Sequence, residues 1–107
     1  MNAVQNGDVR WSDLGGGVKR RVLAHTSDVM AVEVHFETGG VGARHSHPHA
    51  QATYVVSGAF TFTAGGRDCA VGAGDTLAFE RGETHGCVCT AEGTLIDTFS
   101  PMREDFI

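Results

Sequence analysis

The stretch His45-Ser46-His47-Pro48-His49-Ala50-Gln51 places three histidines and a glutamine close together, and His85 follows beyond a glycine-rich region. In an extended chain successive side chains point to opposite faces, so His45, His47 and Gln51 can share one face. Imidazole nitrogens bind first-row transition metals, and an amide oxygen is a neutral, weaker donor. The pattern predicts a divided metal site in which His45, His47, Gln51 and His85 are the ligands.

The remaining histidines are less clearly placed. An isolated histidine is by default an exposed loop residue, and we assign surface or packing roles to His25 and His35, which have no neighbouring ligand pattern. His49 has the same parity as His47 and Gln51, so spacing alone does not exclude it as a ligand. Pro48 disturbs ideal alternation by fixing its own φ and restricting the preceding residue. We therefore place His49 behind the ligands or facing a substrate.

Glycines punctuate the chain between short runs rich in Val, Thr, Phe and Leu, which is typical of strands and tight turns. No segment of helix length shows a helical period. Ser57-Gly58 and Gly65-Gly66 indicate short hairpins, because glycine reaches positive φ without a steric clash. We expect strands at 19–25, 29–36, 50–56, 59–64, 67–71, 76–79, 85–90 and 94–99.

Many short strands at regular spacing predict an all-β sandwich or barrel, and an inward-facing polar cluster favours a jelly-roll β-barrel with a ligand inside. A chain of 107 residues fits a single domain. Residues 1–17 show little pattern beyond Trp11, so we expect an N-terminal arm that docks on the barrel or reaches a partner subunit, with the barrel over 18–107. Open sheet edges and such an arm favour a homodimer.

Composition argues against several functions. The chain has 8 basic and 13 acidic residues, a formal net charge of −5, and no basic patch for a phosphate backbone, so we expect no nucleic-acid partner. It shows neither a signal-peptide pattern nor an apolar run of membrane-spanning length, which predicts a cytoplasmic protein without a membrane partner. The odd number of cysteines fits a reducing compartment. Cys69, Cys87 and Cys89 could be soft metal ligands, but we favour packing as small apolar groups.

A second polar cluster lies near the C-terminus, where Asp97 and Phe99 share one face of a strand that Pro101 ends, and Arg103 follows on a turn. An acid that moves a proton, an aromatic wall and a guanidinium that grips a carboxylate would suit a small anionic sugar acid. From these residues alone, however, a core Phe99 and a surface Asp97–Arg103 pair is the favoured interpretation.

The metal cluster resembles the motifs of the cupin superfamily. The first cupin motif is matched by Gly39, His45, His47, Gln51 and Gly58. The second is matched by Gly74, Gly82 and His85, with Glu80 where proline is usual and Cys89 where asparagine is common. Gln51 stands where most cupins have glutamate, and the missing negative charge makes oxygen chemistry less expected.

Most of the chain further resembles the pectin-degradation cupins of the KdgF family, through 17–24, 45–51, 54–58 and the tail from Asp97 to Phe106. That family linearises 4,5-unsaturated monouronates from pectin or alginate into the open-chain 4-deoxy-5-keto acid. The resemblance implies one divalent ion (Ni, Zn, Mn, Fe or Co) on His45, His47, Gln51 and His85, and an active site lined by Asp97, Phe99 and Arg103.

On this hypothesis the metal is a Lewis acid, Asp97 moves the proton, Arg103 neutralises the substrate carboxylate, and Phe99 and His49 contact the sugar. Two other functions remain open. An iron-dependent dioxygenase would use a nearly identical ligand set, but Gln51 and the polar tail argue against it. A non-catalytic sugar-binding module would usually be fused to an output domain, for which a barrel filling most of 107 residues leaves no room.

Overall fold

The structure, a computed structural model that describes residues 1–107, consists mainly of β-strands. The strands are β1 (Ser12–Gly15), β2 (Val18–His25), β3 (Met30–Phe36), β4 (Val41–His45), β5 (Ala50–Ala64), β6 (Arg67–Gly72), β7 (Thr76–Phe79) and β8 (His85–Ser100). Two single-turn 3-10 helices, η1 (Asn6–Asp8) and η2 (Glu104–Phe106), lie near the chain ends. The all-β prediction is confirmed. No helix is both long and apolar enough to span a membrane.

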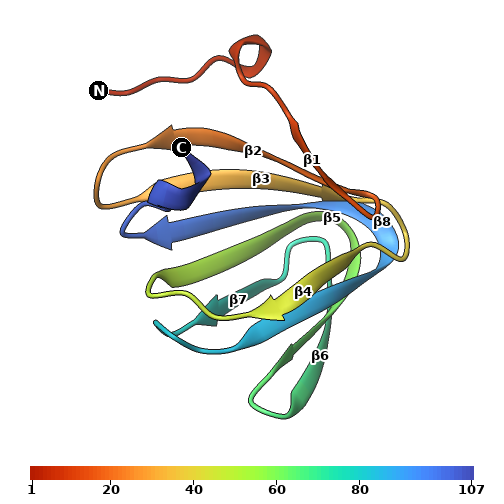
Figure 1. Cartoon of the computed structure of the whole chain (residues 1–107). Helices are drawn as coiled ribbons and strands as arrows, with labels where there is room; N and C mark the ends of the chain where they lie inside the picture. Colours follow the sequence, from red (N-terminus) through yellow and green to blue (C-terminus); the bar gives the residue numbers. More distant parts are fainter.

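The two longest strands, β5 and β8, run antiparallel and connect the whole barrel. The hydrogen-bonded order is β1-β2-β3-β8-β5-β6, with β4 also paired to β8 and β7 also paired to β5. The sheet curls so that β2 and β3 lie opposite β4 and β6 (Figure 1). This is the predicted jelly-roll barrel.

The predicted hairpin at Ser57-Gly58 is wrong, because β5 continues through it. Gly58, with a φ of +81°, instead bends the strand beside Gly93 of β8, and the pairing register shifts at this point. A glycine with positive φ serves a bulge as well as a turn, so the local sequence did not distinguish the two. The strands expected at 85–90 and 94–99 are likewise one strand. The hairpin at Gly65-Gly66 is confirmed, and both glycines have positive φ.

The sequence analysis also missed β1 and β4. β1 is exposed throughout and pairs with β2, so residues 12–15 of the expected arm extend the sheet. The indole of Trp11 also lies against β2, with Lys19 Nζ 4.6 Å and Arg21 Cζ 4.7 Å from its ring centroids. Whether residues 1–17 behave as a unit separate from the barrel stays a prediction.

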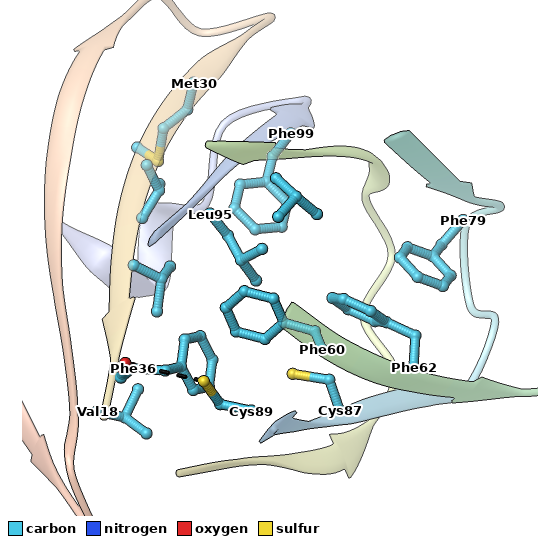
Figure 2. Close-up of a cluster of buried hydrophobic side chains, with 13 residues drawn as sticks. Val18, Met30, Phe36, Phe60, Phe62, Phe79, Cys87, Cys89, Leu95 and Phe99 are labelled. Atoms are coloured by element: carbon cyan, nitrogen blue, oxygen red, sulfur yellow. Dashed lines mark hydrogen bonds between the residues drawn. The ribbon is translucent and has the colours of Figure 1, made fainter. Parts of the chain in front are cut away.

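The core of the barrel is a cluster of aromatic and β-branched side chains, and part of this cluster also lines a cavity (Figure 2). Phe36 and Phe60 meet edge to face with their centroids 5.2 Å apart. Cys87 and Cys89 are buried in this cluster, and burial raises the pKa of the Cys87 thiol to about 12, whereas Cys69 is exposed. Cys87 and Cys89 therefore pack as small apolar groups.

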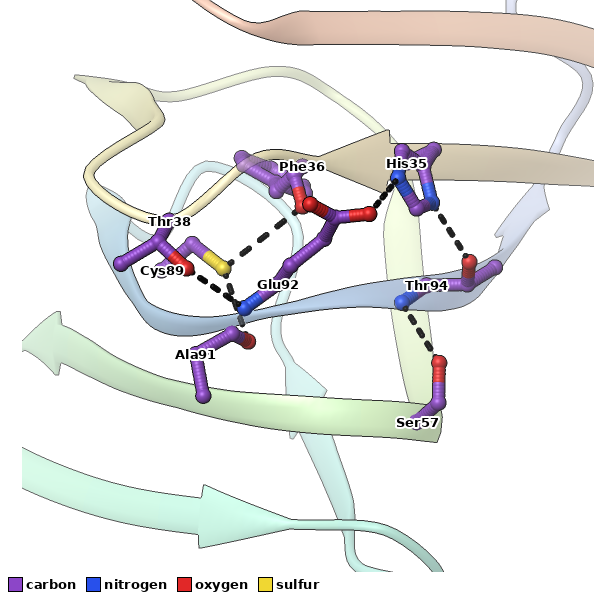
Figure 3. A network of polar contacts seen from close by, with 8 residues as sticks. All are labelled: His35, Phe36, Thr38, Ser57, Cys89, Ala91, Glu92 and Thr94. Atoms are coloured by element: carbon purple, nitrogen blue, oxygen red, sulfur yellow. Dashed lines mark hydrogen bonds and ion pairs between the residues drawn. The ribbon is translucent and has the colours of Figure 1, made fainter.

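Polar contacts close the barrel where β5 and β8 bend (Figure 3). The His35 ring is hydrogen-bonded to Thr94 Oγ1 at 3.0 Å and lies 3.3 Å from a Glu92 carboxylate oxygen. The backbone N–H of Glu92 donates to Thr38 Oγ1. His35 thus has a structural role at this bend.

The bend provides a test of the fold. A Cβ on Gly93 would overlap the carbonyl oxygen of Ser57 and lie 2.6 Å from the Cα of Gly58, so Gly93→Ala must displace backbone. We expect it to lower the free energy of unfolding by about 2 kcal/mol. Gly7→Ala is the matched control, because nothing lies within 4 Å of a Cβ there. Urea denaturation of both variants measures the effect, and equal midpoints would contradict the packing argument.

Candidate metal centre

Three histidines from separate segments meet at the open end of the barrel. His45 ends β4, His47 lies in the following loop, and His85 begins β8 directly opposite His45. One ring nitrogen from each lies within 4.8 Å of the others. The sequence analysis used the alternation of an extended chain to place His45, His47 and Gln51 on one face, and noted that Pro48 disturbs it. In the structure β4 ends at His45 and β5 begins at Ala50, so His47 reaches the cluster through the loop.

The hydrogen bonds of the cluster suit a divalent metal. His45 Nδ1 donates to the carbonyl of Ala43 at 2.7 Å, and His85 Nδ1 donates to that of Glu83 at 2.9 Å. Because the proton of each ring is on Nδ1, Nε2 keeps a free lone pair that can bind a metal. Burial lowers the pKa of His47 and of His85, which favours the neutral rings that bind metal. The donor set therefore fits such an ion.

Gln51 joins the histidines to the acidic part of the site. Its Oε1 lies 3.0 Å from His47 Nε2, while its Nε2 donates to Thr53 Oγ1 at 3.0 Å and to Asp97 Oδ1 at 3.3 Å. The amide thus faces the histidines with its oxygen and the carboxylate with its nitrogen. A glutamate here would put a second carboxylate against Asp97, which gives a physical reason for the departure from the usual cupin residue.

Asp97 projects from β8 into this network. It accepts a hydrogen bond from Thr53 Oγ1 at 2.7 Å. Burial raises the pKa of its carboxyl to about 6, and the hydrogen bonds from Thr53 and Gln51 oppose that shift. Thr53 was missed by the sequence analysis, although it has the parity of Gln51 and lies directly opposite Asp97 in the β5–β8 register. Asp97 is therefore a carboxyl group that can exchange a proton near neutral pH.

The C-terminal tail covers one side of the site. The backbone N–H of Met102 donates to the carbonyl of Ser27 at 3.1 Å, which holds the tail against the β2–β3 loop. Arg103 is buried, and its Nε and Nη2 donate to the two Asp105 carboxylate oxygens at 3.0 and 2.8 Å. The surface Asp97–Arg103 pair considered from the sequence does not form, because Asp105 is the partner of Arg103.

Phe99 and His49 lie beside the histidine cluster. The buried Phe99 ring packs edge to face against His47, with centroids 5.5 Å apart, and against His49 at 6.4 Å. His49 is half-buried, and its Nδ1 has no hydrogen-bond partner. It does not join the three clustered histidines or line the cavity. Its expected contact with substrate stays a prediction.

A cavity of about 510 Å³ lies beside the histidine cluster and the C-terminal tail. Its polar wall includes His45, Gln51, His85, Asp97 and Arg103. Its apolar wall includes Val32, Val34, Phe62, Leu95 and Phe99. Arg20, Asp105 and Phe106 also line it, and the sequence analysis assigned no role to these three. The volume is within the usual range for small-molecule sites.

Comparison with known proteins identifies the family of the chain. The cupin domain family matches residues 32–98. The chain is 41% identical over 99 residues to the pectin degradation protein KdgF of Dickeya dadantii (strain 3937), across 91% of this chain and 90% of that protein. The chain belongs to the KdgF family of cupins.

Two solved structures share the fold of this KdgF-type cupin across nearly its whole length. An RmlC-like cupin from Shewanella frigidimarina NCIMB 400 has a TM-score of 0.93 and 40% identity, covering 98% of this chain and 95% of its own. KdgF from Halomonas sp. has a TM-score of 0.92 and 37% identity, covering 98% and 97%. The fold and family expected from the sequence are confirmed.

The cavity of this KdgF-type cupin brings an exchangeable proton and positive charge next to three histidines that could hold a metal ion. Asp97 supplies an exchangeable proton, and the arginines supply positive charge. Cys87 also lines the cavity, but its raised pKa keeps the thiol protonated, and a protonated thiol is a poor nucleophile. Covalent catalysis by cysteine is therefore disfavoured.

Proposed function

We propose that the protein opens the ring of 4,5-unsaturated monouronates from pectin or alginate to give the open-chain 4-deoxy-5-keto uronate. The kinship with KdgF, a pectin degradation protein, supports this substrate class. The observation that carries the proposal is the Asp97 carboxyl, held by Thr53 and Gln51 next to the histidine cluster. This arrangement offers a proton donor and acceptor beside a metal site.

The proposed metal ligands are His45, His47, Gln51 and His85. Three imidazoles and one neutral amide accept Ni, Zn, Mn, Fe or Co, and we propose one such divalent ion. When bound, the ion supplies Lewis-acid chemistry without changing its redox state. Gln51 keeps the ligand set neutral. Its hydrogen bond to Asp97 holds that carboxyl group beside the proposed ligands.

Ring opening is an isomerisation. As the bond between C1 and the ring oxygen breaks, the C1 hydroxyl loses its proton and the ring oxygen gains one, which leaves an aldehyde at C1 and an enol at C5. Addition of a proton at C4 and loss of the enol proton then give the 5-ketone. Asp97 is proposed to deliver the proton to C4 and to recover one from the enol hydroxyl, which requires a carboxyl that readily changes protonation state.

Phe99 and Arg103 are proposed to position the sugar. The buried Phe99 ring forms an apolar wall against which one face of the sugar can pack. Arg103 donates to Asp105 through Nε and Nη2, whereas its Nη1 has no hydrogen bond within the chain. Nη1 is therefore available to a ligand. The apolar wall of the cavity also limits competing water.

The test is turnover by metal-loaded protein of unsaturated galacturonate and unsaturated mannuronate. Loss of ultraviolet absorbance reports the C4–C5 double bond, and proton spectra in deuterated water report a deuterium at C4 of the product. We expect reaction well above the protein-free rate without oxygen uptake. Oxygen consumption would support the dioxygenase instead, and saturable binding without turnover would support the sugar-binding module.

The expected homodimer stays a proposal. Two features support it: β1 is a fully exposed edge strand, and Tyr54 and Val56 lie exposed along β5. Burying such an edge and such apolar side chains against a second copy would remove both from water.

A further inference from the structure

Arg20 of β2 lies in the cavity wall and has no hydrogen bond or ion pair within the chain. Its guanidinium carbon is 3.7 Å from the centroid of the Phe106 ring. The neighbouring Arg21 contrasts with it. Arg21 Nε donates to Glu33 at 2.7 Å, and its Nη2 donates to Asn6 Oδ1 at 2.7 Å. Of these two consecutive arginines, only Arg20 is left available to a ligand.

Arg20 shares its surroundings with a second arginine. The Arg103 guanidinium also stacks on Phe106, with its Cζ 4.2 Å from the ring centroid. Asp105 is the carboxylate paired with Arg103, and no carboxylate is paired with Arg20. Burial lowers the pKa of Arg20, and the charge of Arg103 lowers it further, while Asp105 raises it. Arg20 is therefore a cavity cation with a second cation nearby and no ion-pair partner of its own.

The two arginines differ in what they can offer a ligand. Arg103 has one edge of its guanidinium closed by both oxygens of Asp105. Arg20 has both edges free, and stacking on Phe106 restricts its orientation before any ligand binds. A planar guanidinium with a free edge matches a carboxylate through two parallel hydrogen bonds.

We infer that Arg20 is the main receptor for the substrate carboxylate and sets the preference of the site for acidic over neutral sugars. This inference rests on the proposed function and extends it, since the clamp was assigned to Arg103 alone. Arg103 then contributes Nη1 and, through Asp105 and Phe106, holds η2 beside the cavity. The unpaired guanidinium of Arg20 fits a substrate that carries one carboxylate.

The experiment compares the unsaturated uronate with its methyl ester, which lacks the negative charge. We expect Arg20→Gln to lower kcat/KM for the acid by about 10- to 100-fold, mainly through KM, and to leave the ester unchanged. The acid-to-ester ratio within one variant cancels any loss of folded protein. Arg20→Lys should retain part of the preference for the acid. Arg21→Gln is the matched control and should keep the wild-type ratio.

Other outcomes separate the inference from the proposed function. If Arg20→Gln keeps the wild-type acid-to-ester ratio, whether or not both rates fall equally, the inference is overturned and ring opening is left intact. Retention of the ratio in Arg20→Gln with its loss in Arg103→Gln assigns the carboxylate to Arg103. A wild-type protein inactive on both substrates overturns the proposed function, and the role of Arg20 with it.

Discussion

Asp97→Asn is expected to lower kcat by about 10²- to 10⁴-fold while the bound metal is retained. Asparagine has nearly the same shape, and its amide oxygen can still accept the hydrogen bond from Thr53. It cannot deliver a proton to C4 or take one from the enol. Because the proposed ligands are untouched, the loss reports proton transfer. Ultraviolet assays give the rate, and elemental analysis gives the metal content.

The chain contains a matched control for this substitution. Thr63 Oγ1 donates to Asp68 Oδ1 at 2.6 Å, so a second threonine–aspartate pair joins two strands, here β5 and β6. This pair is exposed and lies outside the cavity. Asp68→Asn makes the same chemical change and should leave kcat within about twofold. A wild-type rate in Asp97→Asn with metal present would show that another group carries the proton.

The positions of most strands were predicted from the sequence, but the continuity of β5 and of β8 was not. Most strands contain alternating apolar residues, and that signal is local. The union of 50–56 with 59–64 depends on a bend where Gly58 faces Gly93, and residues so far apart in sequence meet only in the folded sheet. β1 and β4 carry few apolar residues and are mostly exposed, so the pattern did not reveal them.

The candidate site shows the same division between local and tertiary information. The histidines were recognised by residue type and spacing, although His47 reaches the cluster from a loop between β4 and β5. Arg20 was missed because it lies in a run of basic residues, which is typical of a solvated face. Its role depends on Phe106 and Asp105, which the folded tail brings to β2. No local pattern contains that contact.

Removal of the metal is expected to lower turnover by about 10³-fold or more, because a Lewis acid contributes several kcal/mol to stabilising charge that develops during reaction. Chelation should also lower Tm, since a ligand that binds only the folded state stabilises it by mass action. Re-addition of a divalent ion should restore both. Turnover that survives complete removal of metal would contradict the assigned chemistry.

His85→Ala distinguishes loss of a ligand from general damage. The His85 ring stacks on Phe79 at 4.1 Å between centroids, so its removal costs packing as well as metal affinity. His35→Ala also removes a ring with two hydrogen bonds, but at the closed end of the barrel. We expect His35→Ala to be less stable yet still to respond to chelator. His85→Ala should show no chelator-dependent change in Tm, because it begins without metal, and a wild-type response there would remove His85 from the ligand set.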